Sequence, residues 1–365
     1  MQFTTPKEKI LNAILIAERI VGKKESLPVL SCILLDASKE LSVRSTNLEA
    51  GVDMKVLGEV GEKGVVAVPA SILSQTLRAV SGDKVTLKSE GANLLIEARG
   101  SKTLIKAVPH EEFPTLSAEE NKKGLKVTRA LLLEALQSVS YAASTSMIRP
   151  ELGSVYVKIE NSKLIAVATD SFRLAEKIVS DASGEGSGDV LVPLKHAQEM
   201  VHILERVTND DVELVIDDSQ LVLIADGLRF VSRIIDGNFP NYKEIIPKSF
   251  TTEATLLKGD FAETLRKARV FSGADQHVGF HVYPKKKVFD VTAQSAAIGE
   301  MSDSLEAAVS GDDIDVNFHI GYVAECLQSV QSDSIVLGFS GAGKPLVIKG
   351  VSDAAFTYLV MPLNR

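Results

Sequence analysis

Apolar and polar positions along this chain follow two periods, one helical and one strand-like, in an order that returns three times. Apolar residues recur at helical spacing from Ile10 to Leu15, and short strand-like runs follow, from a strand expected at Val29 to Leu35 as far as Val68. The order of helix, strands, helix and strands begins again near Arg129 and near Lys258. This pattern predicts an α+β protein in which each unit packs two helices on antiparallel sheets.

The helix starts carry recognisable signals. Thr5-Pro6-Lys7-Glu8 reads as a capping box, with a hydroxyl at the N-cap, Pro at the first helical position and Glu two residues later. Val68-Pro69 and Val192-Pro193 open the second helices of the first two units. The six helices are expected at residues 6–21, 69–80, 129–142, 193–206, 258–270 and 319–330.

Three landmarks repeat in register. The segments LSVRSTNLE, LIAVATDSFRL and FDVTAQSAA align on Thr46, Thr169 and Ala293, at steps of about 124 residues, the size of one domain. Each unit closes on an apolar residue followed by Pro, at Pro114, Pro240 and Pro362. The chain is therefore predicted to hold three similar domains, at residues 1–122, 126–249 and 250–365.

The second copy of the landmark differs from the other two. Phe172-Arg173 stand where the first copy has Glu49-Ala50 and the third has Ala296-Ala297. Divergence within a repeat indicates that the second copy carries a function of its own.

Composition narrows the class of protein. A chain of 365 residues is too long for one core, and only 5% of its residues are aromatic, so Val, Ile, Leu and Ala are expected to fill the cores. No apolar run reaches the roughly 18 residues of a membrane helix, and the N-terminus lacks a signal-peptide core, so we expect a cytoplasmic protein. Cys32 and Cys326 are predicted to be buried, reduced thiols.

The net charge of −8 argues against a protein coated in basic surface. It leaves room for a basic strip on one face, because nucleic-acid binding depends on where the charges lie.

Candidate catalytic chemistry is sparse. Gly338–Lys344, GFSGAGK, matches the first seven positions of a phosphate-binding loop, but Pro345 replaces the required hydroxyl, and a strand pattern follows. A hairpin turn is the better interpretation, although a nucleotide-dependent enzyme stays open as an alternative. His196 and His202 are not spaced as a metal-ligand pair on a helix. We predict no cofactor, no metal site and no catalytic residues.

Four segments together resemble the bacterial sliding clamp family, the beta subunit of DNA polymerase III. They are LPVLSCILLDA (27–37), VATDSFRLA (167–175), NFPNYKEIIP (238–247) and YLVMPLNR (358–365), and the resemblance covers essentially the whole chain. It implies three similar domains per chain and a head-to-tail homodimer that forms a six-domain ring. The ring would encircle double-stranded DNA without reading its sequence and tether the replicative polymerase, so that processivity comes from topology. The clamp loader and other polymerases and repair proteins would be further partners.

The resemblance also implies two sites. One is an apolar pocket that takes a short peptide motif from partner proteins, and its residues here are Leu152, Thr169, Ser171, Phe172, Arg173, Leu174, Pro240, Ile245, Pro345, Leu359, Met361, Pro362 and Leu363. The other is a DNA-facing surface of helix faces that lack acids and of loops, with Lys23, Lys24, Arg78, Arg149, Lys195, Gln198, His202, Arg266 and Arg269. The joint between copies is expected around 71–78 and 271–304.

This sequence departs from the commonest family pattern at Phe172, where a His is frequent, at Glu244, where a basic residue is frequent, and at Asn364-Arg365. A scaffold of three repeated domains that never closes on DNA remains a further alternative.

Overall fold

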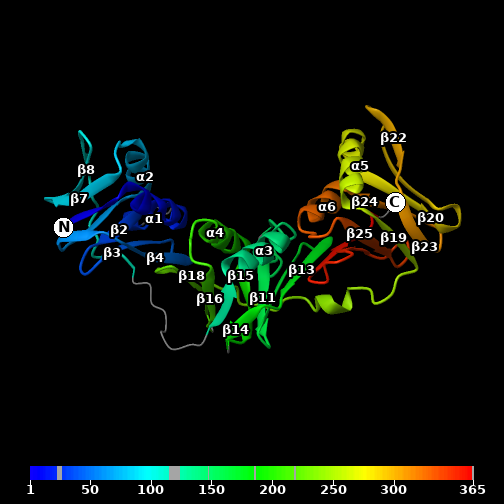
Figure 1. Cartoon of the computed structure of the whole chain (residues 1–365), viewed down its shortest axis with the longest axis horizontal. Coiled ribbons are helices and arrows are strands. Elements are labelled where there is room, and N and C mark those ends of the chain that lie inside the picture. The colour runs from blue at the N-terminus through cyan, green and yellow to red at the C-terminus, as the bar shows by residue number, and fades with distance from the viewer. Residues whose placement is uncertain (23–26, 115–123, 147, 185, 218, 364–365) are drawn as a thin grey trace. The chain divides into compact units, whose positions relative to one another are not determined.

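The structure is a computed structural model, and it describes residues 1–22, 27–114, 124–146, 148–184, 186–217 and 219–363 (Figure 1). The chain divides into two compact units. The first holds Met1–Leu133, Glu160–Ser162 and Ala182–Ile234, and the second holds Glu134–Ile159, Lys163–Asp181 and Ile235–Arg365. The predicted α+β class is confirmed, because helices accompany sheets whose strand pairs are antiparallel.

The first unit contains two sheets. One has the order β5 (Glu59–Glu62), β1 (Gln2–Pro6), β7 (Lys84–Glu90), β8 (Asn93–Ala98) and β9 (Ser101–Ile105). The other has the order β14 (Ala182–Gly184), β10 (Leu125–Thr128), β16 (Asp211–Ile216), β17 (Gln220–Ala225), β18 (Leu228–Arg233), β4 (Ala50–Val56), β3 (Leu41–Thr46), β2 (Cys32–Asp36) and β6 (Val65–Pro69). Its helices are α1 (Lys7–Ile20), α2 (Ala70–Ala79) and α4 (Leu194–Leu204), which follows β15 (Gly188–Pro193).

The second unit also contains two sheets. Eight neighbouring strands run in the order β11 (Ser154–Glu160), β12 (Lys163–Thr169), β13 (Arg173–Val179), β27 (Phe356–Val360), β26 (Leu346–Gly350), β25 (Ser334–Phe339), β19 (Thr252–Leu257) and β23 (Ala307–Gly311). The other sheet has the order β22 (Gly299–Ser304), β21 (Val288–Ser295), β20 (His277–Tyr283) and β24 (Ile314–His319). Its helices are α5 (Lys258–Phe271) and α6 (Ile320–Glu325), while α3 (Arg129–Ser140) begins in the first unit and ends in the second.

The threefold repeat extends to single hydrogen bonds. The first residue of α1, α3 and α5 is basic. Its backbone N–H donates to the carbonyl of an aspartate that lies just before a strand. Its side chain donates to a backbone carbonyl at or beyond the end of the next helix. The backbone pairs are Lys7 with Asp83, Arg129 with Asp210 and Lys258 with Asp333, at 2.7–2.8 Å; the side-chain acceptors are Val80, Leu204 and Val330, at 2.6, 3.1 and 2.8 Å. These anchors align the three repeats independently of the sequence landmarks.

The predicted capping box at Thr5 is wrong. Thr5 lies in β1, before the N-cap position, and its hydroxyl donates to the carbonyl of Leu57 at 2.8 Å. Pro6 takes the N-cap position and no side chain caps α1. The local sequence pattern does not predict that Gln2–Pro6 lies between β5 and β7 in a sheet, because these pairings join residues far apart in sequence.

Two further expectations need correction. The strand expected from Val29 starts only at Cys32, because Pro28–Ser31 form a 3-10 turn. Val, Ile, Leu and Ala do not fill the core of the third repeat alone: Phe261, Phe280, Phe289 and Phe318 are fully buried among them, and the ring centroids of contacting pairs are 5.4–6.3 Å apart.

Other expectations are confirmed. Cys32 and Cys326 are buried free thiols. The glycine-rich segment is the turn of the β25–β26 hairpin, where the N–H of Lys344 donates to the carbonyl of Gly341. It therefore does not lead into a helix, as a phosphate-binding loop does.

Candidate functional site

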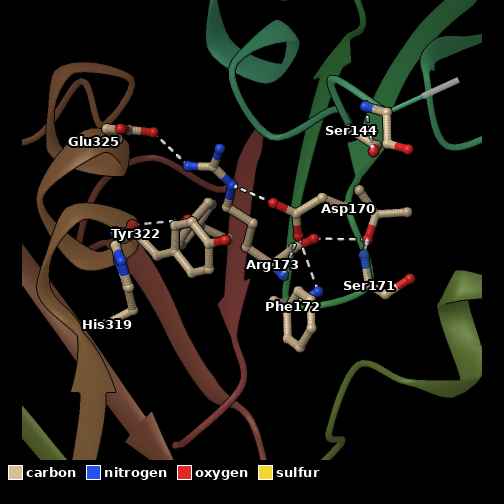
Figure 2. A network of polar contacts seen from close by, with 11 residues as sticks. Ser144, Asp170, Ser171, Phe172, Arg173, His319, Tyr322 and Glu325 are labelled. Atoms are coloured by element: carbon tan, nitrogen blue, oxygen red, sulfur yellow. Dashed lines mark hydrogen bonds and ion pairs between the residues drawn. The ribbon is translucent and has the colours of Figure 1, made fainter. Parts of the chain in front are cut away.

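A five-residue turn joins β12 to β13 and sets the geometry of the site. The hydroxyl of Thr169 donates to the carbonyl of Arg173 at 2.6 Å and accepts the N–H of Ser171. The Oδ1 atom of Asp170 accepts the N–H groups of Phe172 and Arg173, at 2.9 and 3.0 Å (Figure 2). Ser171 has a φ of 81°, a left-handed conformation that these bonds hold in place. The turn leaves the ring of Phe172 60% exposed.

The first repeat builds the same turn. Thr46 donates to the carbonyl of Ala50 at 2.8 Å, Asn47 accepts the N–H groups of Glu49 and Ala50, and Leu48 has a φ of 74°. The backbone of the turn is therefore a property of the repeat, and the second copy differs from the first in its side chains.

Arg173 fixes the turn to the body of the second unit. Its Nε donates to Oδ2 of Asp170 at 2.9 Å, and its Nη1 donates to Oε2 of Glu325 on α6 (Figure 2). The guanidinium lies 4.4 Å from the ring centroid of Tyr322 and 5.8 Å from that of Tyr141, a cation–π arrangement. Only 11% of the Arg173 side chain is exposed, so these contacts act in a largely water-excluded setting.

His319 extends this network at the start of α6. Burial, followed by the nearby charge of Arg173, lowers the pKa of His319 below its ordinary value. A neutral ring leaves Nδ1 free to accept the N–H of Tyr322, at 3.4 Å, which caps the helix. The ring centroids of His319 and Tyr322 are 4.3 Å apart.

The C-terminal segment runs along the turn. The N–H of Met361 donates to the carbonyl of Phe172 at 2.7 Å, and the N–H of Leu363 donates to the carbonyl of Asn317 at 2.8 Å. Next to these contacts, Leu174 of β13 pairs with Leu359 of β27. Residues 169–174 and 359–363 therefore form one continuous surface with half-buried apolar side chains.

An apolar cluster lies beneath this surface. Val167, Leu174, Val347, Leu359 and Tyr242 are buried together, and Phe239 and Phe250 pack against them. The phenol of Tyr242 donates to Glu176 at 2.5 Å. Burial and the adjacent carboxylate raise the pKa of Tyr242, so the phenol stays a donor.

The predicted pocket residues fall into three groups. Thr169, Ser171, Phe172, Arg173, Leu174, Leu359, Met361 and Leu363 are joined by the contacts described above, and Pro362 lies between Met361 and Leu363. Pro240 and Ile245 flank the buried Tyr242, through bonds of 2.7 and 3.0 Å to its backbone, and Ile245 is 50% exposed. Pro345 is buried next to β26, and Leu152 is buried in a loop where it bonds Ser144 and Arg149.

Sequence reasoning missed the residues that hold Arg173. The family resemblance implies no role for Asp170, although it lies within the repeated landmark. Tyr322 and Glu325 lie about 150 residues further along the chain, on α6, so no local pattern connects them with Arg173. A possible signal was the repeat itself, because Glu199 on α4 occupies the position of Glu325 and also binds an arginine, Arg19.

The DNA-facing candidates are mostly exposed, but their surroundings were wrongly predicted to lack acids. Carboxylates lie within 4 Å of Arg78, Arg149, His202 and Arg266, from Glu18, Glu151, Glu205 and Glu263. The sequence of one helix cannot reveal an acid on its neighbour, as for Glu18 of α1 beside Arg78 of α2. Lys195, Gln198 and Arg269 are exposed on their helices, and Lys23 and Lys24 lie outside the described residues.

Among the described residues, no group of His, Cys, Asp and Glu side chains is arranged to hold a metal ion. No helix within the described ranges is long and apolar enough to cross a membrane.

Three profiles of one protein family match the chain in succession. They are the N-terminal, central and C-terminal domains of the DNA polymerase III beta subunit, at residues 1–117, 126–241 and 243–364. The beta sliding clamp of Bacillus subtilis is 25% identical over 378 aligned positions, with all of both chains covered. That of Staphylococcus epidermidis is 22% identical, with 100% of this chain and 99% of the relative covered.

Solved structures agree in fold. The DNA polymerase III beta subunit of Thermotoga maritima superposes with a TM-score of 0.94 at 24% identity, covering 100% of this chain and 99% of that one. A Pseudomonas aeruginosa sliding clamp bound to griselimycin superposes with a TM-score of 0.93 at 21% identity, with both chains fully covered.

The repeated α+β fold and the three successive matches define a DNA sliding clamp. The chain belongs to the DNA polymerase III beta subunit family, and the resemblance read from the sequence is confirmed.

Proposed function

We propose that two copies of this chain join head to tail into a closed ring of six domains, which surrounds duplex DNA and tethers a replicative polymerase. The observation that carries the proposal is the threefold repeat, because the same helix anchors recur at Lys7, Arg129 and Lys258. Three equivalent domains, at residues 1–122, 126–249 and 250–365, supply half of such a ring. The protein then acts by topology and effective concentration, without a reaction of its own and in the cytoplasm.

The free edges of two sheets suit the joint between copies. Strand β9 ends one sheet and β22 ends another, so within the described residues each has an unpaired side. Exposed cations lie on and just after β9, at Lys102 and Lys106, and the acids Glu300 and Asp303 lie on β22. Exposed apolar side chains are also near each edge, Leu104 and Ile72 in the first repeat and Val270 and Ile298 in the third. A joint between unlike surfaces closes into a ring when its rotation allows.

The topological mechanism is tested by retention on DNA. After loading, the protein should stay on a nicked circular duplex and leave when that circle is cut once. Gel filtration of the loaded DNA measures the difference, and equal retention on circle and linear duplex would contradict encirclement.

We propose that the surface formed by residues 169–174 and 359–363 receives the short peptide motif of partner proteins. It offers the exposed ring of Phe172 and the adaptable side chain of Met361 beside a buried apolar floor. The sliding clamp of Pseudomonas aeruginosa that binds griselimycin supports a ligand site in this fold.

The test of this site is deletion of Met361–Arg365. The N–H groups of Met361 and Leu363 bond residues of their own unit, so the deletion should abolish peptide binding and leave the dimer intact. Fluorescence anisotropy with a partner-derived peptide reads the first effect, and sedimentation reads the second. Loss of the dimer would contradict the assignment.

DNA contact is proposed to be weak and to involve phosphates alone. Arg78 and Arg266 lie within 4 Å of carboxylates, and so does the ring of His202, whereas Lys195 and Arg269 have no ion-pair partner among the described residues. We therefore rank Lys195 and Arg269 as the stronger contacts, and a double substitution to Gln should reduce the salt dependence of DNA binding. The nucleotide-dependent enzyme is not favoured, because its loop is a hairpin turn.

A further inference from the structure

A cavity of about 410 Å³ lies in the first unit, between α1, the end of β4 and the segment after α4. It lies at the Met54–Leu228 end of the paired strands β4 and β18. The equivalent strands of the second unit are β13 and β27, where the surface around Phe172 adjoins the other end, at Arg173 and Val360. The cavity is therefore not the counterpart of the proposed peptide surface.

The repeat explains why this space is open. Lys177 of β13 is the counterpart of Met54, and Glu134 of α3 is the counterpart of Asn12. In the second unit these two side chains form an ion pair at 2.6 Å, with Asp353 at 3.9 Å from the same ammonium, and Lys177 is only 6% exposed. Asn12 and Met54 form no such pair, and both line the cavity.

The lining combines a cationic rim with an apolar floor. Lys9, Lys55 and Arg206 stand around the cavity, and Ile16 and Leu228 are among its apolar lining residues. Lys55 is already paired with Glu40 at 2.5 Å. Lys9 is exposed and has no ion-pair partner within the part of the chain that the structure describes. The guanidinium of Arg206 donates to Oδ1 of Asn12 at 3.5 Å, a long bond to a neutral acceptor.

One acid in the lining decides the class of ligand. Asp226 sits in the tight turn between β17 and β18, and Thr208 donates to its Oδ2 at 2.9 Å, which leaves Oδ1 as an acceptor. A fixed carboxylate disfavours a polyanion such as a nucleic-acid backbone. It suits a peptide, whose N–H groups need acceptors while its own carboxylates pair with Lys9 and Arg206.

We propose that this cavity is a second docking site for partner proteins, which takes a short segment with an acidic residue next to an apolar one. The cationic rim binds the carboxylate, the floor of Ile16, Met54 and Leu228 receives the apolar side chain, and Asp226 accepts a backbone N–H. The site is independent of the surface around Phe172, so one protomer can hold two different segments at once.

Methionine methyl groups report on both sites in one spectrum. The chain has six methionines; Met54 lines the cavity and Met361 belongs to the proposed peptide surface. The full-length protein, labelled with ¹³C at the methionine methyls, is titrated with acetyl-Glu-Leu-Asp-Ala-amide. We expect saturable shifts at Met54 and none at Met361.

Controls separate charge recognition from general binding. The neutral peptide acetyl-Gln-Leu-Asn-Ala-amide should bind at least tenfold more weakly, and so should the acidic peptide to the double variant Lys9→Gln, Arg206→Gln. The matched variant Lys163→Gln, which removes an exposed cation away from the cavity, should bind like the unchanged protein. Unchanged spectra of the free variants establish that they are folded.

Three results overturn the proposal. The first is the absence of a Met54 shift at millimolar peptide, and the second is equal affinity for the neutral peptide. The third is an equal or larger Met54 shift with inorganic phosphate or a short DNA duplex, a result that would make the cavity an anion or nucleic-acid site. The titration measures the chemical shift of the Met54 methyl group in the protein without DNA. A negative result would therefore refute the second docking site and leave the retention test of the ring unaffected.

Discussion

Replacing Arg173 with Met tests whether the turn is held by a buried charge. Arg173 and Asp170 are 11% and 13% exposed, so their hydrogen-bonded ion pair should contribute about 1.5–3 kcal/mol. Glu325 is 48% exposed, and its pair with the same guanidinium should contribute about 0–1 kcal/mol. Contact with the ring of Tyr322, at 4.4 Å, adds about 1 kcal/mol. The substitution should therefore destabilise the turn by about 2.5–5 kcal/mol.

Hydrogen exchange is the suitable assay, because a chain of several domains need not unfold in one step. Amides of β13 and β27 are followed by mass spectrometry in the unchanged protein and in Arg173→Met. A loss of about 3 kcal/mol corresponds to exchange faster by about a hundredfold, since 1.4 kcal/mol is a factor of ten. Glu325→Gln is the matched variant, and it should change exchange less than about tenfold.

A double-mutant cycle makes the prediction sharper. The coupling of Arg173 with Asp170, measured with Asp170→Asn, should exceed its coupling with Glu325. If Glu325 shows the larger coupling, or if Arg173→Met leaves exchange unchanged, the turn is held by its backbone bonds alone and the buried charge is not its anchor. Partner-peptide affinity should fall together with exchange protection, because Phe172 is adjacent to Arg173 in the turn.

Three further predictions concern buried groups. Burial raises the pKa of the Cys326 thiol, so Cys326 should resist iodoacetamide in the folded protein and react after unfolding, as mass spectrometry can measure. Burial lowers the pKa of His196 below its ordinary value of 6.5, so the unfolded chain takes up a proton more readily than the folded chain. The free energy of unfolding in urea should therefore fall as the pH falls from about 7 to 5. It should fall by less in the variant His196→Asn, which lacks the titrating group. Lys177→Met should cost about 2–4 kcal/mol, because it removes the ion-pair partner of Glu134 at 2.6 Å and the cation that lies 3.9 Å from Asp353, which is 8% exposed. The companion change Glu134→Gln should restore part of the loss in the same urea titration.

Periodicity was sufficient to predict the helices. The expected starts of α3 and α5 coincide with the structure, and those of the other four lie within one residue, because each amphipathic pattern follows directly on an extended segment. It failed for β1, whose five residues become a strand only through pairing with β5 and β7. It failed also for Thr5, because a hydroxyl near a helix start can serve a distant carbonyl equally well.

The site was predictable in part. Thr169, Phe172 and Arg173 could be named from the family resemblance and from the divergence of the second repeat. The partners of Arg173 could not, because Glu325 is brought to the turn by the pairing of β13 with β27 and the packing of α6. The acid beside Arg78 was overlooked for the same reason, because Glu18 lies on an adjacent helix. Glu263 lies three residues before Arg266 on α5, so helical spacing alone could have predicted that pair.

Two equivalent places in the repeat, here called junctions, each pair a glutamate on a helix with an arginine, but the arginine comes from a different position in each. Glu199 of α4 and Glu325 of α6 occupy equivalent positions, five residues after the start of their helices. In the first junction Glu199 pairs at 2.6 Å with Arg19 on α1, and the turn carries Ala50 where the second junction carries Arg173. In the second junction the arginine, Arg173, lies in the turn itself. The pair Arg19–Glu199 therefore joins two helices, α1 and α4, whereas the pair Arg173–Glu325 joins a turn to α6. Arg173 thereby connects the turn that carries the exposed ring of Phe172 to α6, so two turns with equal backbone bonds differ in how their side chains are anchored.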